Sequence, residues 1–113
     1  MSCLFCKIVN REIAAQVVFE NEHVLAFKDI NPQAPTHVLL VPKQHLPGIH
    51  EATSGEKEML GELLIAGRKV AEDLGLFPSG YRLVINQGAD AGQSVFHLHL
   101  HVLGGRAMAW PPG

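Results

Sequence analysis

The apolar positions of this chain follow two different periods, and the change between them separates strands from a helix. Short apolar runs at residues 17–20 and 24–29 flank Asn21 and Glu22, as the two strands of a hairpin would. Two prolines within residues 31–35 exclude a regular helix, and a run rich in valine and leucine follows at residues 36–42. The first part of the chain therefore predicts three strands.

From residue 53 the apolar spacing changes to three and four, which is typical of an amphipathic helix. Thr53 and Glu56 have the spacing of a capping box, and Gly75 is a typical C-cap residue. The predicted apolar stripe between them consists of Met59, Leu60, Leu63, Leu64, Gly67, Val70, Ala71 and Leu74. This pattern predicts one helix of about 20 residues, which needs a sheet to cover its apolar side.

Two further strands are predicted at residues 81–87 and 97–103, joined by a loop at residues 88–94. Strands followed by one long helix and then more strands indicate an α+β fold with a mainly antiparallel sheet. The chain has 113 residues, 47% of them hydrophobic, and contains no internal repeat or long linker. We therefore expect a single domain over residues 1–113.

Charge and hydropathy argue against two classes of partner. The net charge of -2 and the pI of about 6.4 provide no basic field for binding nucleic acid. No apolar run approaches the roughly 20 residues needed to cross a bilayer, and the N-terminus lacks the apolar segment of a signal peptide. We expect a cytoplasmic protein with neither a nucleic-acid nor a membrane partner.

The strand at residues 97–103 has the sequence HLHLHVL, in which histidines alternate with apolar residues. Successive side chains of a strand point to opposite faces, so His97, His99 and His101 should share one face. Three neighbouring imidazoles cannot all be protonated without repulsion, which favours neutral rings near pH 7. A single histidine on a strand usually has no special function, but three in strict alternation favour a functional site.

Two chemistries suit this set of histidines. Three imidazoles can bind a metal ion and leave one position open for catalysis. Alternatively, neutral imidazoles can act on a phosphate, and the loop before the motif favours this because Gly88, Gly92 and Ser94 offer N–H groups and a hydroxyl to an anion. The two cysteines, Cys3 and Cys6, form a CxxC that suits a redox pair, half of a metal site or two reduced thiols.

The HLHLHVL motif resembles the signature of the histidine triad (HIT) superfamily. Further segments are similar to its Hint branch, the purine nucleoside phosphoramidases: DINPQAPTH (29–37), VPKQH (41–45), NQG (86–88), GQSV (92–95), GGR (104–106) and WPPG (110–113). Together they cover nearly the whole chain. The resemblance implies a HIT-like α+β fold, with a five-stranded mainly antiparallel sheet, one long helix and a short N-terminal helix.

The resemblance also implies a mechanism. His99 would be the nucleophile, with Nε2 attacking the α-phosphorus to form a nucleotidyl-histidine that water then hydrolyses. This requires an acceptor for the Nδ1–H of His99, which the family takes from a main-chain carbonyl. His101 would contact the phosphate and act as general acid, with His37 and His97 completing the catalytic set and no cofactor needed for catalysis.

For substrate binding, the resemblance implies that Asp29 holds the ribose hydroxyls. Asn86 and Ser94 would contact the phosphate and leaving group, together with the main chain of Gly92 and Val95. The predicted walls of the base site are Leu4, Phe5, Ile8, Phe27 and Ile30. Each prediction has an ordinary alternative, since apolar residues usually form the core and asparagine and glycine usually form turns.

Two further implications concern metal and assembly. In bacterial-type relatives a structural zinc would be held by residues corresponding to Cys3, Cys6, His45 and His97, a set that suits tetrahedral Zn²⁺. The Hint branch also implies a homodimer in which the sheet continues across both subunits, because an edge strand needs a partner. The tail at residues 110–113 would then reach toward the partner's site.

The sequence therefore predicts a hydrolase of purine nucleoside 5′-phosphoramidates, such as adenosine 5′-monophosphoramidate or aminoacyl-type nucleotide conjugates, with a nucleoside monophosphate and an amine as products. Dinucleoside polyphosphate hydrolysis remains an alternative. A nucleotide-binding regulatory protein that acts through protein partners is another, as is a metal-dependent hydrolase with three histidine ligands. Nucleotidyl transfer is disfavoured because the transferase branch has glutamine at the position of His101.

Overall fold

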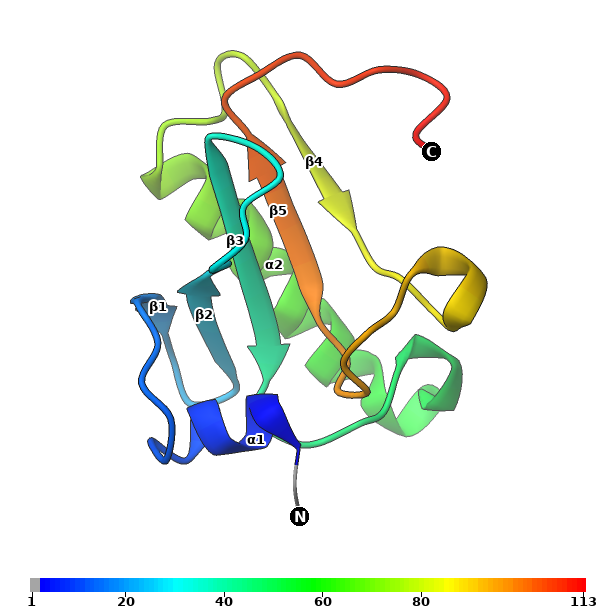
Figure 1. Ribbon diagram of the computed structural model, residues 1–113. Coiled ribbons are helices and arrows are strands. Elements are labelled where there is room, and N and C mark those ends of the chain that lie inside the picture. The colour runs from blue at the N-terminus through cyan, green and yellow to red at the C-terminus, as the bar shows by residue number, and fades with distance from the viewer. Residues whose placement is uncertain (1–2) are drawn as a thin grey trace.

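The computed structural model describes residues 3–113. Its helices and strands are α1 (Leu4–Val9), β1 (Val17–Glu20), β2 (Val24–Lys28), β3 (Thr36–Pro42), α2 (Lys57–Asp73), β4 (Tyr81–Val84) and β5 (Leu100–Gly104), with short 3₁₀ turns η1 (Ile49–Glu51), η2 (Ser54–Glu56) and η3 (Ala89–Ala91). The five strands form one antiparallel sheet in the order β1-β2-β3-β5-β4 (Figure 1). The predicted α+β fold, with its long helix and short N-terminal helix, is confirmed.

Helix α2 covers one face of the sheet (Figure 1). Its buried residues Leu63, Ala66 and Val70 belong to a core that also contains apolar side chains of β2, β3 and β5. Gly67 allows this close packing, since a Cβ atom there would lie 2.8 Å from Cδ2 of Leu100. The helix faces the sheet through this strip of small and branched residues.

The predicted signal at the end of α2 acts as expected, whereas the predicted starting signal lies one turn before the helix. Thr53 and Glu56 form a capping box at the start of η2, and α2 follows at Lys57 without a side-chain cap of its own. At the other end Gly75 has φ of 75°, its N–H donates to the carbonyl of Glu72, and the next N–H, of Leu76, donates to that of Ala71. This pair of bonds is the Schellman motif that a glycine in the left-handed region permits.

The opposite face of the sheet has a second, smaller core beneath α1. Phe5 and Ile8 of α1 are buried there with Leu25, Phe27, Leu39 and Val41 of β2 and β3. Because β3 is covered on both faces, its residues from His37 onward are all buried, and its sequence is a continuous apolar run. Helix α1 thus shelters one end of the face opposite α2 (Figure 1).

Three predicted strands differ from the structure at their ends. The strand predicted at residues 81–87 ends at Val84, and the one predicted at 24–29 ends at Lys28. The strand predicted at 97–103 begins only at Leu100, because the residues before it leave the ladder: the N–H of Leu98 donates to the carbonyl of Leu46, in the segment after β3. The end of a strand depends on where its hydrogen-bonded partner strand stops. The alternation of apolar and polar residues does not specify that point.

Two positions of the predicted helix stripe do not reach the core. Leu64 and Leu74 are 46% and 40% exposed, and the neighbouring Ile65 is 63% exposed. The buried side of α2 is centred on Leu63, Gly67 and Val70, so the predicted stripe is wider than the side that contacts the sheet. Within residues 3–113 no helix is both long and apolar enough to cross a membrane.

Candidate active site

The three alternating histidines lie on the face of the sheet opposite α2. Leu98, Leu100 and Val102 belong to the core with α2. On the other side, the ring of Phe5 packs edge-on against the rings of His97 and His99, with centroids 6.1 and 5.1 Å apart. The predicted shared face of the histidines is therefore confirmed. This face is covered by α1. His97 is fully buried there, and only 7% of His99 is exposed.

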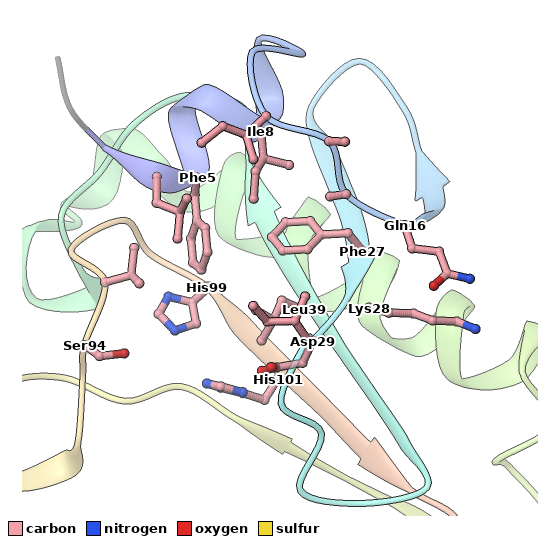
Figure 2. Close-up of a pocket in the computed structure, with 16 residues that line it drawn as sticks. Phe5, Ile8, Gln16, Phe27, Lys28, Asp29, Leu39, Ser94, His99 and His101 are labelled. Atoms are coloured by element: carbon pink, nitrogen blue, oxygen red, sulfur yellow. The ribbon is translucent and has the colours of Figure 1, made fainter.

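The tautomer of His99 follows from one hydrogen bond. Its Nδ1 lies 2.7 Å from the main-chain carbonyl oxygen of His97, which can only accept. His99 therefore carries its proton on Nδ1, and its Nε2 has an unshared electron pair. The residue also lines a pocket (Figure 2), so in this tautomer the Nε2 electron pair can serve as a nucleophile toward a ligand bound there.

The pocket has a volume of about 520 Å³, which lies within the range of small-molecule sites. Eight of the predicted substrate residues line it, together with His99 and His101: Leu4, Phe5, Ile8, Phe27, Asp29, Ile30, Ser94 and Val95. Phe5, Ile8 and Phe27 surround one end, and Asp29 and Ser94 lie toward the two histidines, whereas Gln16 and Lys28 lie at the far side (Figure 2). The pocket is thus suited to a ligand with a flat apolar part and a polar or charged part.

Two predicted substrate residues, Asn86 and Gly92, are not among the residues that line the pocket. The prediction that Gly92 offers its main-chain N–H to an anion is not met, because this N–H donates to the carbonyl of Ala89 within η3. The N–H of Gly88 is also engaged, by Oε1 of the buried Gln93. Positive φ values of 83° at both glycines serve this compact loop, which carries Ser94 to the pocket.

Several residues of the pocket were not predicted. They are Leu39 of β3, Lys28 at the end of β2, and the loop residues Ile13, Ala14, Ala15 and Gln16. The loop joins the site because the N–H of Lys28 donates to the carbonyl of Gln16 beside β2. Nothing in the local sequence marks these residues, except that Lys28 places a positive charge directly before Asp29.

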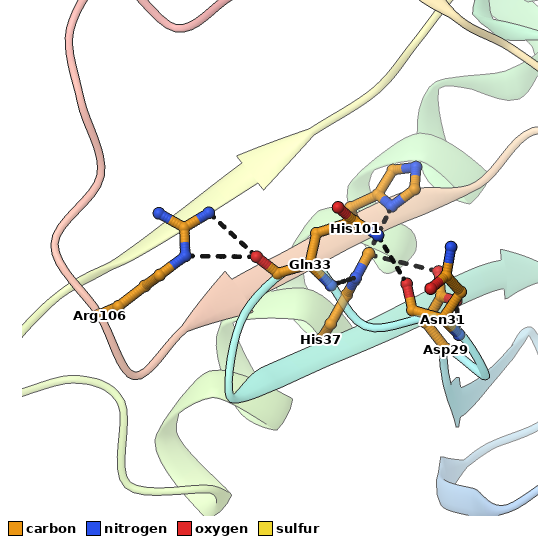
Figure 3. Close-up of polar contacts among 6 residues, drawn as sticks. All are labelled: Asp29, Asn31, Gln33, His37, His101 and Arg106. Atoms are coloured by element: carbon orange, nitrogen blue, oxygen red, sulfur yellow. Dashed lines mark hydrogen bonds and ion pairs between the residues drawn. The ribbon is translucent and has the colours of Figure 1, made fainter.

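His101 belongs to a hydrogen-bonded group with His37 and Asp29 (Figure 3). Nε2 of His37 lies 2.9 Å from Nδ1 of His101 and 3.5 Å from Oδ2 of Asp29. Burial, with the adjacent rings of His99 and His37, lowers the pKa of His101 to about 4. Burial also lowers the pKa of His37, against the opposing charge of Asp29. Both rings are therefore neutral at pH 7.

This group has the residue types of a metal site, since Asp29, His37 and His101 place potential ligand atoms within 4.8 Å of one another. Its hydrogen bonds oppose such a use. The main-chain N–H of Gln33 donates to Nδ1 of His37 at 3.0 Å, so the proton of His37 lies on Nε2, the atom that would have to bind the metal. The group is a hydrogen-bond network in this structure.

The predicted zinc ligands Cys3, Cys6, His45 and His97 are brought together, with their ligand atoms also within 4.8 Å of one another. Nδ1 of His97 lies 3.1 Å from Nδ1 of His45 and 3.4 Å from Sγ of Cys3. Sγ of Cys6 lies 3.2 Å from Nδ1 of His45 and 3.5 Å from Nδ1 of His97. Tetrahedral Zn²⁺ with ordinary bond lengths would separate such atoms by about 3.3 to 3.6 Å.

The surroundings of His97 also suit a ligand. Its Nε2 lies 2.8 Å from the carbonyl oxygen of Pro42, so Nε2 carries the proton and Nδ1 has a free electron pair. The four residues therefore fit a closed tetrahedral metal site. The ring of His97 faces these thiols, whereas its main-chain carbonyl orients His99.

Known proteins are similar to this chain over nearly its full length. The profile of the HIT domain matches residues 10–108. An uncharacterized HIT-like protein of Synechocystis sp. is 56% identical over 110 residues, which cover 97% of this chain and 96% of that protein. A 14 kDa zinc-binding protein of Zea mays is 53% identical over 112 residues, covering 97% of this chain and 87% of that protein.

Among solved structures, a HIT family hydrolase from Legionella pneumophila Philadelphia 1 superposes with a TM-score of 0.97 and 53% sequence identity, covering 99% of this chain and 100% of that chain. This degree of similarity supports a hydrolase in general. Since the HIT domain profile covers most of the sequence and the matching proteins share about half of its residues, the chain belongs to the HIT family.

Proposed function

We propose that this protein is a purine nucleoside phosphoramidase of the Hint branch, which releases a nucleoside monophosphate and an amine. The observation that carries the proposal is the hydrogen bond of 2.7 Å between Nδ1 of His99 and the carbonyl of His97. It leaves the Nε2 electron pair of a buried, pocket-lining histidine available for attack on phosphorus.

The two ends of the pocket suit the two ends of a nucleotide. Phe5, Ile8, Phe27 and Leu39 surround a space with the apolar character that a purine ring requires. Asp29, at the end of β2, would accept hydrogen bonds from the ribose hydroxyls. This places the phosphate near His99, His101 and Ser94, so the proposed substrate spans the pocket from base to phosphate.

The proposed reaction has two steps. The Nε2 electron pair of His99 forms a bond to the α-phosphorus, and the electron pair of the scissile P–N bond leaves with the amine nitrogen, which gains one proton. Water then attacks the phosphorus and gives up one proton, and the bond to His99 breaks so that Nε2 recovers its electron pair. Proton uptake in the first step balances proton release in the second.

His101 would support this reaction through its Nε2. This atom is buried and has no hydrogen-bond partner among the described residues, so a bound phosphoryl oxygen or leaving nitrogen would satisfy it. With a pKa of about 4, His101 is neutral in the free protein and carries one N–H. In this protonation state we assign His101 the role of donating a hydrogen bond from Nε2 to the phosphoryl group. To act as a general acid toward the leaving amine, His101 would first have to gain a second proton.

We also propose that Cys3, Cys6, His45 and His97 hold a structural zinc ion. Two thiolates and two imidazoles would complete its coordination, so the metal would supply stability and no open position for substrate. Cys3 is the N-cap of α1 and Cys6 lies within it. Binding would fasten α1, which carries Phe5, against the sheet beside His99.

We further propose a cytoplasmic homodimer. A reducing compartment would keep Cys3 and Cys6 as thiolate ligands. The edge strand β4 and the exposed apolar side chains Leu64, Ile65 and Leu83 would form the contact between subunits, since they expose 46%, 63% and 37% of their surface. Light scattering after size exclusion should give twice the chain mass, and the mass of a monomer at micromolar concentration would contradict this assembly.

The central test is turnover of a fluorogenic adenosine 5′-phosphoramidate. Wild-type protein should release the amine, and His99→Ala should lower kcat/KM by roughly four or more orders of magnitude, because the covalent path is lost. His23→Ala is the matched control, since His23 is an exposed histidine beside Glu22, and it should retain full activity. Equal rates for wild type and His99→Ala would reject the proposal, whereas activity in excess chelator would exclude a metal-dependent hydrolase.

A further inference from the structure

Arg106 lies outside the pocket, yet its guanidinium holds the loop that reaches His37. Nε and Nη2 of Arg106 donate to the main-chain carbonyl of Gln33 at 3.2 and 3.0 Å (Figure 3), and Nη1 donates to that of Ala107 at 3.1 Å. A planar guanidinium with two N–H groups on one carbonyl fixes the direction of that carbonyl. Arg106 therefore sets the position of Gln33 from the segment that follows β5.

The main-chain N–H of Gln33 contacts Nδ1 of His37 at 3.0 Å. A peptide nitrogen can donate but not accept, so the direction of this bond is certain. A flipped ring of His37 would place carbon atoms at both of its present nitrogen contacts, with Gln33 and with His101. His37 therefore accepts at Nδ1 and carries its own proton on Nε2.

This assignment passes to His101. Nε2 of His37 lies 2.9 Å from Nδ1 of His101, so Nδ1 accepts and the proton of His101 lies on Nε2. That Nε2 is the buried atom without a partner among the described residues, on a side chain that lines the pocket. One main-chain donor thus determines that His101 offers an N–H to the ligand.

The same contacts limit the number of protons that the pair can hold. A third proton would have to enter at Nδ1 of His37, which faces the Gln33 N–H, or at Nδ1 of His101, which faces the Nε2–H of His37. The carboxylate of Asp29, at 3.5 Å from Nε2 of His37, is the nearby charge that favours a further proton, and the ring of His99, at 5.0 Å between centroids, carries no charge in the tautomer described above. Each Nδ1 already accepts from an N–H group, so neither can take up a proton while these contacts last, and both rings stay neutral.

We propose that the main-chain N–H of Gln33, oriented by Arg106, is an anchor that fixes the tautomers of His37 and His101. The anchor presents a single hydrogen-bond donor, the Nε2–H of His101, to an anionic phosphoryl group. Arg106 is then a positioning residue for the reaction. The inference rests on the proposed function only where it names the phosphoryl group as the acceptor.

The tautomers can be read without substrate from two-bond ¹H–¹⁵N correlations of the imidazole nitrogens. In the wild-type protein His37 and His101 should both carry the proton on Nε2. In Arg106→Ala both should become mixtures of tautomers, and kcat/KM for the adenosine phosphoramidate should fall about tenfold, with most of the loss in kcat. Arg106→Lys, with fewer and more flexible donors, should lie between these two proteins.

Two control variants separate the anchor from general loosening. Gln33→Ala keeps the main-chain N–H and should keep the wild-type tautomers. Arg82→Ala removes the bond of 3.0 Å to the carbonyl of Ala109, and so loosens the same C-terminal segment without touching Gln33. It should also leave the tautomers unchanged.

Three results would overturn the anchor: an Nδ1–H tautomer of His101 in the wild type, unchanged tautomers in Arg106→Ala, or an equal shift in Arg82→Ala. The tautomers are measured in the free protein and need no substrate. A lack of phosphoramidate turnover would therefore reject the proposed function, whereas the NMR correlations alone would decide whether the anchor exists.

Discussion

Two clusters of imidazoles lie on the same face of this sheet, and both contain residue types that bind metals. In the first, Cys3, Cys6, His45 and His97 converge, and in the second, Asp29, His37 and His101. The two clusters differ in the main-chain group that contacts one ring nitrogen of a histidine in each, His97 in the first and His37 in the second. His97 faces the carbonyl of Pro42, which draws the proton to Nε2 and frees Nδ1, whereas His37 faces the N–H of Gln33, which leaves its other nitrogen protonated.

The comparison shows that residue type alone does not decide between ligand and hydrogen-bond donor. A main-chain acceptor behind an imidazole prepares a metal ligand or a nucleophile, and a main-chain donor prepares a hydrogen-bond donor. His99, with the carbonyl of His97 on its Nδ1, belongs to the first kind. The following experiments test this difference.

The largest expected effect is the loss of metal from the first cluster. Cys6→Ser should reduce bound zinc from about one ion per chain to far below one, and should lower Tm by more than about 10 °C, because binding free energy is also folding free energy. Metal analysis and thermal unfolding measure both quantities. Asp29→Ala, in the second cluster, is the matched control and should keep its zinc. A full complement of zinc in Cys6→Ser would remove the distinction between the clusters.

Next in size is the loss of His37. His37→Ala should leave zinc content unchanged but lower kcat/KM roughly a hundredfold, since His101 then loses the group that fixes its tautomer. His45→Ala should give the reverse order, with zinc lost more completely than activity in zinc-supplemented buffer. If His37→Ala lost its metal instead, the second cluster would be a metal site and the hydrogen-bond assignment would be wrong.

A smaller effect is expected from Asp29. Asp29→Ala should raise the Kd for adenosine monophosphate by about tenfold and change the rate of the chemical step less, because ribose hydrogen bonds to a charged group are lost. Calorimetric titration measures the affinity, and single-turnover kinetics measures the chemical step. Unchanged affinity would show that the ribose does not contact this carboxylate.

The smallest effect concerns stability against pH. The pKa of His101 is about 4 in the folded protein and 6.5 as its ordinary value, so the unfolded chain binds more protons between these limits. The free energy of unfolding should therefore fall as pH falls from 6.5 toward 4, and His101→Gln should show a shallower fall. Denaturant unfolding in zinc-containing buffer at several pH values measures this difference. Parallel curves for the two proteins would contradict a neutral His101 in the folded state.

Much of this architecture could be predicted because its signals are local. The alternation in HLHLHVL placed three histidines opposite Leu98 and Leu100, and the structure confirms this division of faces. The glycine at position 75 marked the end of the long helix, and the capping box at Thr53 marked the 3₁₀ turn that leads into it. Such patterns depend on the chain's own geometry over a few residues, so the sequence is enough to read them.

The composition of the pocket was predicted only in part. Family similarity indicated Phe5, Asp29 and Ser94, which do line it, but also Gly92, whose N–H is used within its own loop. Gln16 and Lys28 line the pocket because the loop after α1 bonds to the end of β2, a contact between segments that no short pattern encodes.

The sequence by itself determined which residues alternate, that one long helix ends near Gly75, and which side chains have the chemistry for nucleophile or ligand. Only the tertiary structure decided which nitrogen of each imidazole carries a proton. That choice depends on a donor or acceptor placed within about 3 Å of the ring. For His97 this group is the carbonyl of Pro42, which is 55 positions away in the sequence and meets the ring only in the folded chain. For His37 it is the N–H of Gln33, four positions away, in a loop that Arg106 holds from beyond β5.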